Sequence, residues 1–267
     1  MQVITLGQAI ALTVLAIITG IDFWLEALFI FRPLIVCTLT GLILGNLPLG
    51  LVAGGLTELA FAGLTPAGGT QPPNPIMAGI MTVVIAYTTG TDPKTSIGLA
   101  LPFSILMQYI ILIFYSIFSV FMGKADKAAK EADTKTIVKI NILLTAIVSL
   151  TYGVITFLSV YAAQDAMRAL VSSMPAWLIH GLEIAGGMLP AVGFAMLLKV
   201  MLKPKYVPYL IIGFLVPTFK SLTNMLPVAV IGVVLAMIGY YRDKDQAEMI
   251  KEMAPSITSG GDDDEGI

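Results

Sequence analysis

Long uncharged runs dominate the pattern of hydrophobic and polar positions along this chain. Four of them cover 33–57, 59–91, 95–123 and 140–164. Each run is longer than the ~20 residues that a helix needs to cross the hydrocarbon core of a bilayer. A further apolar segment over about 3–20 lacks the basic start and the cleavage site of a signal peptide, so we expect it to be a first span. The pattern predicts an all-α, polytopic membrane protein.

The second of these runs is interrupted by prolines. Pro66, Pro72, Pro73 and Pro75 lie close together, and proline removes a backbone donor and disfavours helical geometry in the residue before it. No continuous helix is therefore expected across 65–75. The short apolar arms on either side, 51–64 and 76–90, predict a re-entrant, proline-broken hairpin. An ordinary loop outside the membrane is the alternative.

The broken stretch also carries the polar side chains of the apolar region. Unpaired backbone groups are costly in hydrocarbon, so broken segments with polar side chains are typical of cavities where transporters hold substrates. A second stretch, EIAGGMLPAVG (183–193), repeats the order of acid, small residues and proline seen in ELAFAGLTPAG (58–68). Carboxylates and carboxamides can bridge sugar hydroxyls, although polar amino acids fit such a site too. The predicted substrate-binding residues are Glu58, Thr65, Thr70, Gln71, Asn74, His180 and Glu183.

The composition excludes several other classes of protein. Only 12% of the 267 residues are charged and the net charge is −2, so no basic patch indicates a nucleic-acid partner. The chain has one cysteine and one histidine, and it contains no phosphate-binding loop or metal-binding motif. We therefore expect no catalytic residue, cofactor or metal in this chain.

The remaining charges give expectations about topology. The stretch Lys124–Lys139 holds five lysines against three acids, which predicts a surface helix or loop on the cytoplasmic side. We expect a membrane domain over 1–241 and a disordered, charged, cytoplasmic tail over 242–267. For Arg32 we expect either an ion pair with Asp22 or Glu26, or a side chain that reaches a lipid head group.

Several long motifs resemble enzyme IIC of the mannose-family phosphotransferase systems. They are FRPLIVCTLTGLILGN (31–46), GGLTEL (54–59) and HGLEIAGGMLPAVGF (180–194). Within that family, GIDFWLEALF (20–29), LTPAGGTQPPNPIMAG (64–79) and LPFSILMQY (101–109) resemble the N-acetylgalactosamine/galactosamine branch. By position, the acid of the family's GGxxE motif is Glu58. Mannose-type relatives often have Asp at positions 46 and 74, where this chain has Asn46 and Asn74.

The resemblance implies an elevator-type transporter subunit in the bacterial inner membrane, with a moving core domain and a static scaffold. It implies an enzyme IID membrane partner, phosphoryl transfer from soluble IIA and IIB proteins, and a trimer of IIC–IID heterodimers in the lipid bilayer. The implied function is translocation of an amino sugar, with the sugar phosphorylated by IIB. The alternative is an autonomous, proton-coupled secondary transporter of a polar solute, with Glu58 or Glu183 as the proton site.

Overall fold

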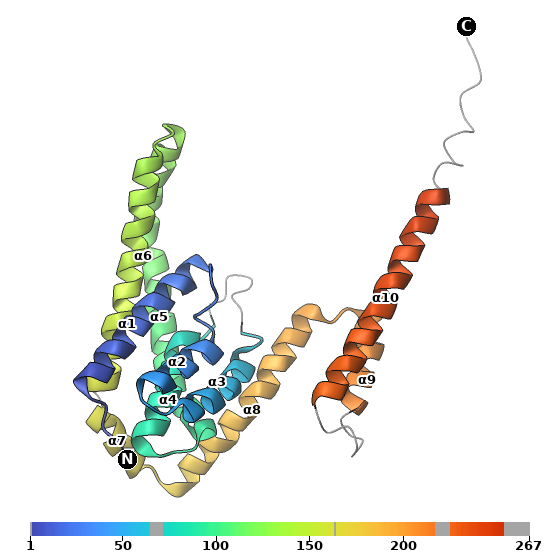
Figure 1. Ribbon diagram of the computed structural model, residues 1–267. Helices are drawn as coiled ribbons and strands as arrows, with labels where there is room; N and C mark the ends of the chain where they lie inside the picture. The colour runs from blue at the N-terminus through green and yellow to red at the C-terminus, as the bar shows by residue number, and fades with distance from the viewer. Residues whose placement is uncertain (1, 65–71, 163, 217–224, 254–267) are drawn as a thin grey trace. The chain divides into compact units, whose positions relative to one another are not determined.

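The computed structural model describes residues 2–64, 72–162, 164–216 and 225–253, and these residues form helices and connections without any strand (Figure 1). The chain divides into two compact units, 1–200 and 201–267, each of which is described by itself. The helices of the first unit are α1 (Leu6–Leu25), α2 (Pro33–Ile43), α3 (Leu47–Phe61), α4 (Pro75–Thr89), α5 (Pro93–Lys130), α6 (Thr134–Phe157) with a π-helical turn η1 (Leu158–Ala162), α7 (Gln164–Ser173) and α8 (Ala176–Met201).

The helices of the first unit fall into two length classes. Among the described residues of the chain, five helices are long and apolar enough to cross a membrane, and α1, α5, α6 and α8 are the four that lie in this unit. The helices α2, α3 and α4 have 11, 15 and 15 residues. At 1.5 Å per residue they are roughly 16 to 23 Å long, which is shorter than a hydrocarbon core of about 30 Å. The prediction of short apolar segments beside full spans is confirmed.

The short helix α4 lies at the centre of this unit. It packs most extensively on α5 and also on α2, α3 and α1, and the stretch 76–86 is buried without exception. A helix that is apolar on all sides is expected in such a position. Its two central hydroxyls are satisfied locally, since Thr82 and Thr88 donate to carbonyls four residues earlier at 2.7 and 2.8 Å. The chain enters through Pro75 at the first turn and leaves at Gly90, whose φ of 74° is left-handed.

The helices α2 and α3 form a tight antiparallel hairpin through glycines. A Cβ atom on Gly50 would lie 2.6 Å from the Cys37 carbonyl oxygen, and one on Gly41 would lie 2.6 Å from the Gly50 Cα. Gly50 and Gly54 form a GxxxG pattern, which allows two helix backbones to approach closely in a membrane. Glu58 is the next residue in the same i, i+4 row. It therefore lies on the face of α3 that packs on α2, near the start of α2. The helix α3 packs more extensively on α2 than on α4. Our sequence prediction pairs the α3 segment with the 76–90 arm instead.

The stretch Lys124–Lys139 closes a long helical hairpin. The 38 residues of α5 are about 57 Å long, nearly twice the hydrocarbon thickness, so the charged end of α5 extends beyond it. This hairpin of α5 and α6 projects from the rest of the first unit in Figure 1. Asp133 begins α6 as its N-cap, and hydrogen bonds from Thr136 lower the pKa of its exposed carboxyl below the ordinary value. The prediction of a surface helix in this stretch is confirmed.

Two expectations about the C-terminal half differ from the structure. The helix α8 runs without interruption through Gly186, Gly187 and Pro190, so this segment is not a second broken arm. In the second unit, η2 (Pro204–Tyr206) and α9 (Val207–Leu215) are followed by α10 (Met225–Met253). The helix α10 continues twelve residues past position 241, the boundary we expected between membrane domain and disordered tail. The residues 242–253 are mostly charged and are helical, and those from 254 onward lie outside the described residues.

Candidate functional site

Two helix ends frame the candidate site. The helix α3 ends at Phe61 and α4 begins at Pro75, and Ala60, Phe61 and Ala78 form a small buried cluster that joins these ends. Leu64, Leu101 and Leu189 pack against the cluster from the following segment, from α5 and from α8. Three of the predicted binding residues, Thr65, Thr70 and Gln71, lie in the connection between the two helices and outside the described residues.

Asn74 lies at the start of α4, fully buried, with hydrogen bonds to three elements. Its Oδ1 accepts from the Met77 backbone N–H at 3.0 Å, which caps the helix. Its Nδ2 donates to the Tyr152 hydroxyl of α6. Its backbone is tied to Ser104 of α5, which accepts the Asn74 N–H at 3.1 Å and donates its hydroxyl to the Asn74 carbonyl at 2.7 Å. No local pattern in the sequence indicates Tyr152 or Ser104 as partners of Asn74.

The two asparagines singled out by the sequence resemblance, Asn46 and Asn74, share one structural role. Asn46 caps α3 by accepting from the Leu49 N–H at 3.2 Å, as Asn74 caps α4. Asp and Asn are equally good N-caps, because each offers a side-chain oxygen to the first free N–H groups. Capping therefore requires an oxygen at both positions but no negative charge.

Glu58 forms an ion pair with Arg32. Its Oε1 accepts from Arg32 Nε at 2.8 Å and from the terminal guanidinium nitrogen, and its Oε2 accepts from the Leu34 N–H at 3.1 Å. The side chains are 33% and 23% exposed for Arg32 and Glu58, so the pair is partly open to its surroundings. Arg32 thus pairs with Glu58, and not with Asp22 or Glu26, the two carboxylates that we expected.

The buried carboxylate of Asp22 has a different role from the one expected. It accepts backbone hydrogen bonds from Leu28 at 2.7 Å, from Ile30 at 2.6 Å and from Phe31 at 3.3 Å. These donors lie in the loop between α1 and α2, where Phe29 has a left-handed φ of 57°. A carboxylate with several N–H donors is satisfied inside apolar surroundings, so Asp22 holds this loop folded.

The two segments with similar acid–glycine–proline patterns contact each other. A Cβ atom on Gly193 of α8 would lie 2.8 Å from the Leu59 carbonyl oxygen, and one on Gly63 would collide with the Gly193 carbonyl. Further back on α8, a Cβ on Gly186 would collide with the Lys94 carbonyl of α5. The glycines at 186 and 193 are spaced by about two helical turns, and they bring α8 against the ends of α3 and α5.

His180 and Glu183 lie apart from the other predicted site residues. Their Nδ1 and Oε2 atoms are 3.5 Å apart on α8, and the side chains are 71% and 49% exposed. Glu183 precedes Gly193 by ten residues, or about 15 Å of helix. Within the described part of the chain, no hydrogen bond or ion pair joins either residue to Glu58 or Asn74.

The site offers binding chemistry of one kind. Glu58 near the end of α3 belongs to a carboxylate–guanidinium pair, and Asn74 at the start of α4 supplies a neutral carboxamide beside hydroxyl groups. Groups of both kinds can donate to and accept from sugar hydroxyls. Among the described residues, no group of three or more His, Cys, Asp or Glu side chains could hold a metal ion. Our sequence prediction did not include Arg32 among the site residues. The i, i+4 row of Gly50, Gly54 and Glu58 could have indicated it, because this row directs Glu58 toward the start of α2, where Arg32 lies.

Comparison with known proteins assigns the family. The family model of the PTS system sorbose-specific IIC component matches residues 6–238. The N-acetylgalactosamine permease IIC component 1 of Escherichia coli K12 is 58% identical over all 267 residues, which is 100% of both chains. The sorbose-specific EIIC component of Klebsiella pneumoniae is 31% identical, and the mannose-specific EIIC component of E. coli K12 is 30% identical. Each of these two matches covers 89% of this chain and 89% of the relative.

Two solved structures are similar to this chain over nearly its whole length. One, described as a membrane protein, has a TM-score of 0.79 and 28% identity, and the match covers 89% of this chain and 96% of that one. The other is the mannose transporter ManYZ in complex with microcin E492, with a TM-score of 0.57 and 26% identity over 90% of this chain and 97% of that one. The sequence resemblance and the predicted all-α membrane fold are thus confirmed. The chain belongs to the sorbose-type family of phosphotransferase-system IIC components, the multi-pass permease subunits of enzyme II complexes in the bacterial inner membrane.

Proposed function

We propose that this chain binds an amino sugar, N-acetylgalactosamine or galactosamine, and carries it across the inner membrane for phosphorylation by a separate IIB subunit. The observation that carries the proposal is the 58% identity over the full chain to an N-acetylgalactosamine permease IIC component, against about 30% to sorbose and mannose components. An identity that is almost twofold higher over equal or greater coverage favours the amino sugar as substrate.

We infer that the complete permease contains an enzyme IID membrane subunit and works with soluble IIA and IIB proteins, as a trimer of IIC–IID heterodimers. The similarity to a mannose transporter that was solved as ManYZ supports a second membrane component. The absence of a phosphate-binding loop from the sequence is consistent with phosphoryl transfer on another chain.

We further propose that the sugar binds between the ends of α3 and α4. Glu58 and Asn74 border the connection that carries Thr65, Thr70 and Gln71, so these five residues are close along the chain. The proposed binding site is an opening between these two helix ends. Asn74 uses one amide hydrogen and one lone pair in its side-chain hydrogen bonds, which leaves one of each for a ligand. Because Asn74 is fully buried, a sugar reaches it only after neighbouring side chains move. His180 and Glu183 would contribute only if α8 shifts toward this opening.

Sugar affinity of the purified IIC–IID complex tests the substrate assignment. Calorimetric titration with N-acetylgalactosamine, galactosamine, mannose and sorbose should give the tightest binding for the first two sugars. Gln71→Ala and Asn74→Ala, each checked for intact assembly, should weaken binding of the preferred sugar by roughly 10-fold or more. Each variant removes a hydrogen-bond partner of the sugar, and a buried polar group left without its partner costs about 1–3 kcal/mol. Equal affinities for all four sugars, or tighter binding of mannose or sorbose, would contradict the assignment.

We propose that the turn between α5 and α6 and the charged end of α10 share the cytoplasmic side. The lysine excess of the first stretch supports this orientation. Single cysteines at the exposed positions Asp126 and Asp245 should resist an impermeant maleimide in whole cells and react in inverted vesicles. The native Cys37 is fully buried, so the unmodified chain is the control. Labelling of either cysteine from outside would refute the orientation.

A further inference from the structure

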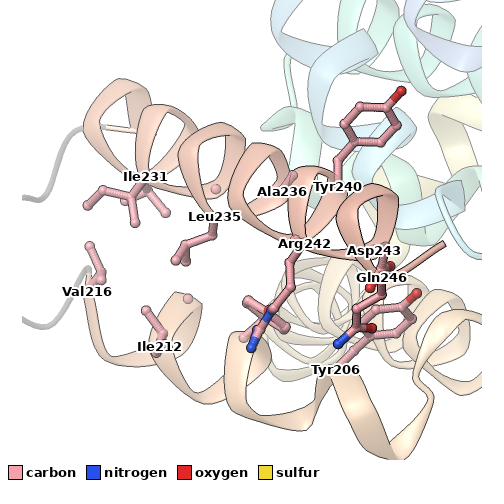
Figure 2. Close-up of a pocket in the computed structure, with 15 residues that line it drawn as sticks. Tyr206, Ile212, Val216, Ile231, Leu235, Ala236, Tyr240, Arg242, Asp243 and Gln246 are labelled. Atoms are coloured by element: carbon pink, nitrogen blue, oxygen red, sulfur yellow. The ribbon is translucent and has the colours of Figure 1, made fainter. Parts of the chain in front are cut away.

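The second unit contains a cavity that the proposed sugar site does not use. It lies between α9 and α10 and has a volume of about 830 Å3 (Figure 2). We call it the α9–α10 groove. Its residues come only from η2, α9, the residue that follows α9, and α10, so it is a feature of the second unit alone.

One end of the groove is apolar. Figure 2 shows Val216 and Ile231 at this end, with Ile212 and Leu235 next along the groove. Gly213, Gly232 and Gly239 also line the groove, and a Cβ atom added to any of them would meet nothing within 4 Å. The glycines therefore leave empty space in the groove, because no described residue occupies the volume that side chains at these three positions would fill.

The other end of the groove is polar and carries one cation, Arg242, and one anion, Asp243. Figure 2 shows Tyr206, Arg242, Asp243 and Gln246 gathered there. The apolar part of α10 ends at Tyr241, after 17 residues or about 26 Å from Met225, so this end lies near the edge of the hydrocarbon core. Tyrosine and arginine at such a position are typical of the head-group region.

Arg242 is the group at this end that can receive an anion. No ion pair to Arg242 occurs within the described residues, whereas the neighbouring Lys244 lies 3.8 Å from Glu248. The planar guanidinium can hold two oxygens of one phosphate, and the Gln246 amide lies beside it as a neutral donor. Asp243 carries the opposite charge at the same end, and it would accept from a hydroxyl rather than contact a phosphate.

We propose that the α9–α10 groove binds one anionic phospholipid, with its phosphate on Arg242 and an acyl chain along the glycines toward Val216 and Ile231. The order of chemistry along the groove, from polar groups with the Arg242 guanidinium at the membrane edge to apolar side chains in its interior, matches the order within such a lipid. Basic pockets between transmembrane helices on the cytoplasmic side are known to bind anionic lipid head groups.

Native mass spectrometry of the full chain, purified alone and in complex with its membrane partner, tests the proposal. The probes are phosphatidylglycerol, phosphatidylcholine with the same acyl chains, and glycerol 3-phosphate, which has no acyl chain. We expect one retained phosphatidylglycerol per IIC chain, at least 5-fold weaker retention of phosphatidylcholine, and no binding of glycerol 3-phosphate at the same concentration.

Matched variants separate the two halves of the groove. Arg242→Gln should weaken retention of phosphatidylglycerol about 5-fold or more and leave that of phosphatidylcholine unchanged, whereas Lys244→Gln should change neither. Ala236→Phe, which fills the groove, should weaken both lipids. Val234→Phe, on the opposite side of α10 and outside the groove, should weaken neither.

Four results would overturn the proposal. The first is equal retention of the two lipids, and the second is unchanged retention of phosphatidylglycerol in both Arg242→Gln and Ala236→Phe. The third is retention by the chain alone that disappears in the complex, which would mean that a segment of the partner protein occupies the groove. Binding of glycerol 3-phosphate that Ala236→Phe leaves intact would assign Arg242 to a soluble phosphate compound and would equally contradict the lipid.

Discussion

A double-mutant cycle on the ion pair of Arg32 and Glu58 can separate sugar binding from structural support. Glu58 contacts the Arg32 guanidinium and the Leu34 backbone N–H, so part of its role is to join α3 to the start of α2. The proposed site requires a second role, in which the same carboxylate accepts a hydrogen bond from the sugar. Replacing each residue by Gln, alone and together, removes its charge; Glu58→Gln also keeps the size of the side chain, whereas Arg32→Gln shortens it.

The exposure of the pair sets the expected magnitude. Breaking a buried ion pair costs 3–5 kcal/mol, and exposed pairs contribute about 0–1 kcal/mol. Side chains that are 33% and 23% exposed lie between these limits, so we expect each single variant to lower the free energy of unfolding by about 1–3 kcal/mol. The double variant should be no less stable than the worse single variant, because one interaction is removed in all three.

Sugar affinity is the second quantity to be measured for the variants of the double-mutant cycle. If Glu58 contacts the sugar, Glu58→Gln should weaken binding by roughly 10- to 150-fold, the loss of one charge-assisted hydrogen bond, both in the native chain and in the Arg32→Gln background. The assay is calorimetric titration of N-acetylgalactosamine into the purified complex. Stability is measured by denaturant titration in mixed micelles.

The reasoning would be refuted by either half of the cycle. If the affinity loss caused by Glu58→Gln vanishes once Arg32 is already Gln, then Glu58 acts only through Arg32 and is not a ligand. If the two single losses of stability simply add in the double variant, then the ion pair is not a stabilising contact.

Two further predictions concern packing and hydrogen bonding inside the first unit. Gly50→Ala should lower the free energy of unfolding by about 1–3 kcal/mol, because the added methyl group would collide with the Cys37 carbonyl. Gly55→Ala is the control and should be close to neutral, because nothing lies within 4 Å of a Cβ at that position. Equal effects of the two variants would contradict the packing of α2 on α3. Tyr152→Phe should cost about 1–3 kcal/mol, since it leaves the buried Asn74 amide without its acceptor, and a fully native unfolding midpoint would argue against that hydrogen bond.

Much of the architecture follows from short-range signals in the sequence. Uncharged runs longer than 20 residues predict the spans. An Asn shortly before a Pro marks the capped starts of α3 and α4, a local signal that our sequence prediction did not use. The proline cluster at 66–75 likewise predicts that no helix joins these two elements. Each of these signals depends on neighbours within one or two helical turns.

The contacts of the site depend on longer separations, which the pattern does not encode. Asn74 and Tyr152 are 78 positions apart, and their hydrogen bond requires the packing of α6 beside the start of α4. Arg32 and Glu58 are 26 positions apart and meet because glycines set the register of α2 on α3. Pro190 predicted a break that does not occur, because transmembrane helices tolerate a proline where other groups satisfy the freed carbonyl.

Reconstituted transport tests most directly the claim that this chain is the sugar-translocating subunit of a phosphotransferase permease. Proteoliposomes that contain this chain with its IID partner, supplied inside with phosphorylated IIB, should accumulate N-acetylgalactosamine as its phosphate. Proteoliposomes with the chain alone should accumulate none, with or without a proton gradient. Uptake of free sugar by the lone chain, driven by that gradient, would contradict the account and identify an autonomous secondary transporter.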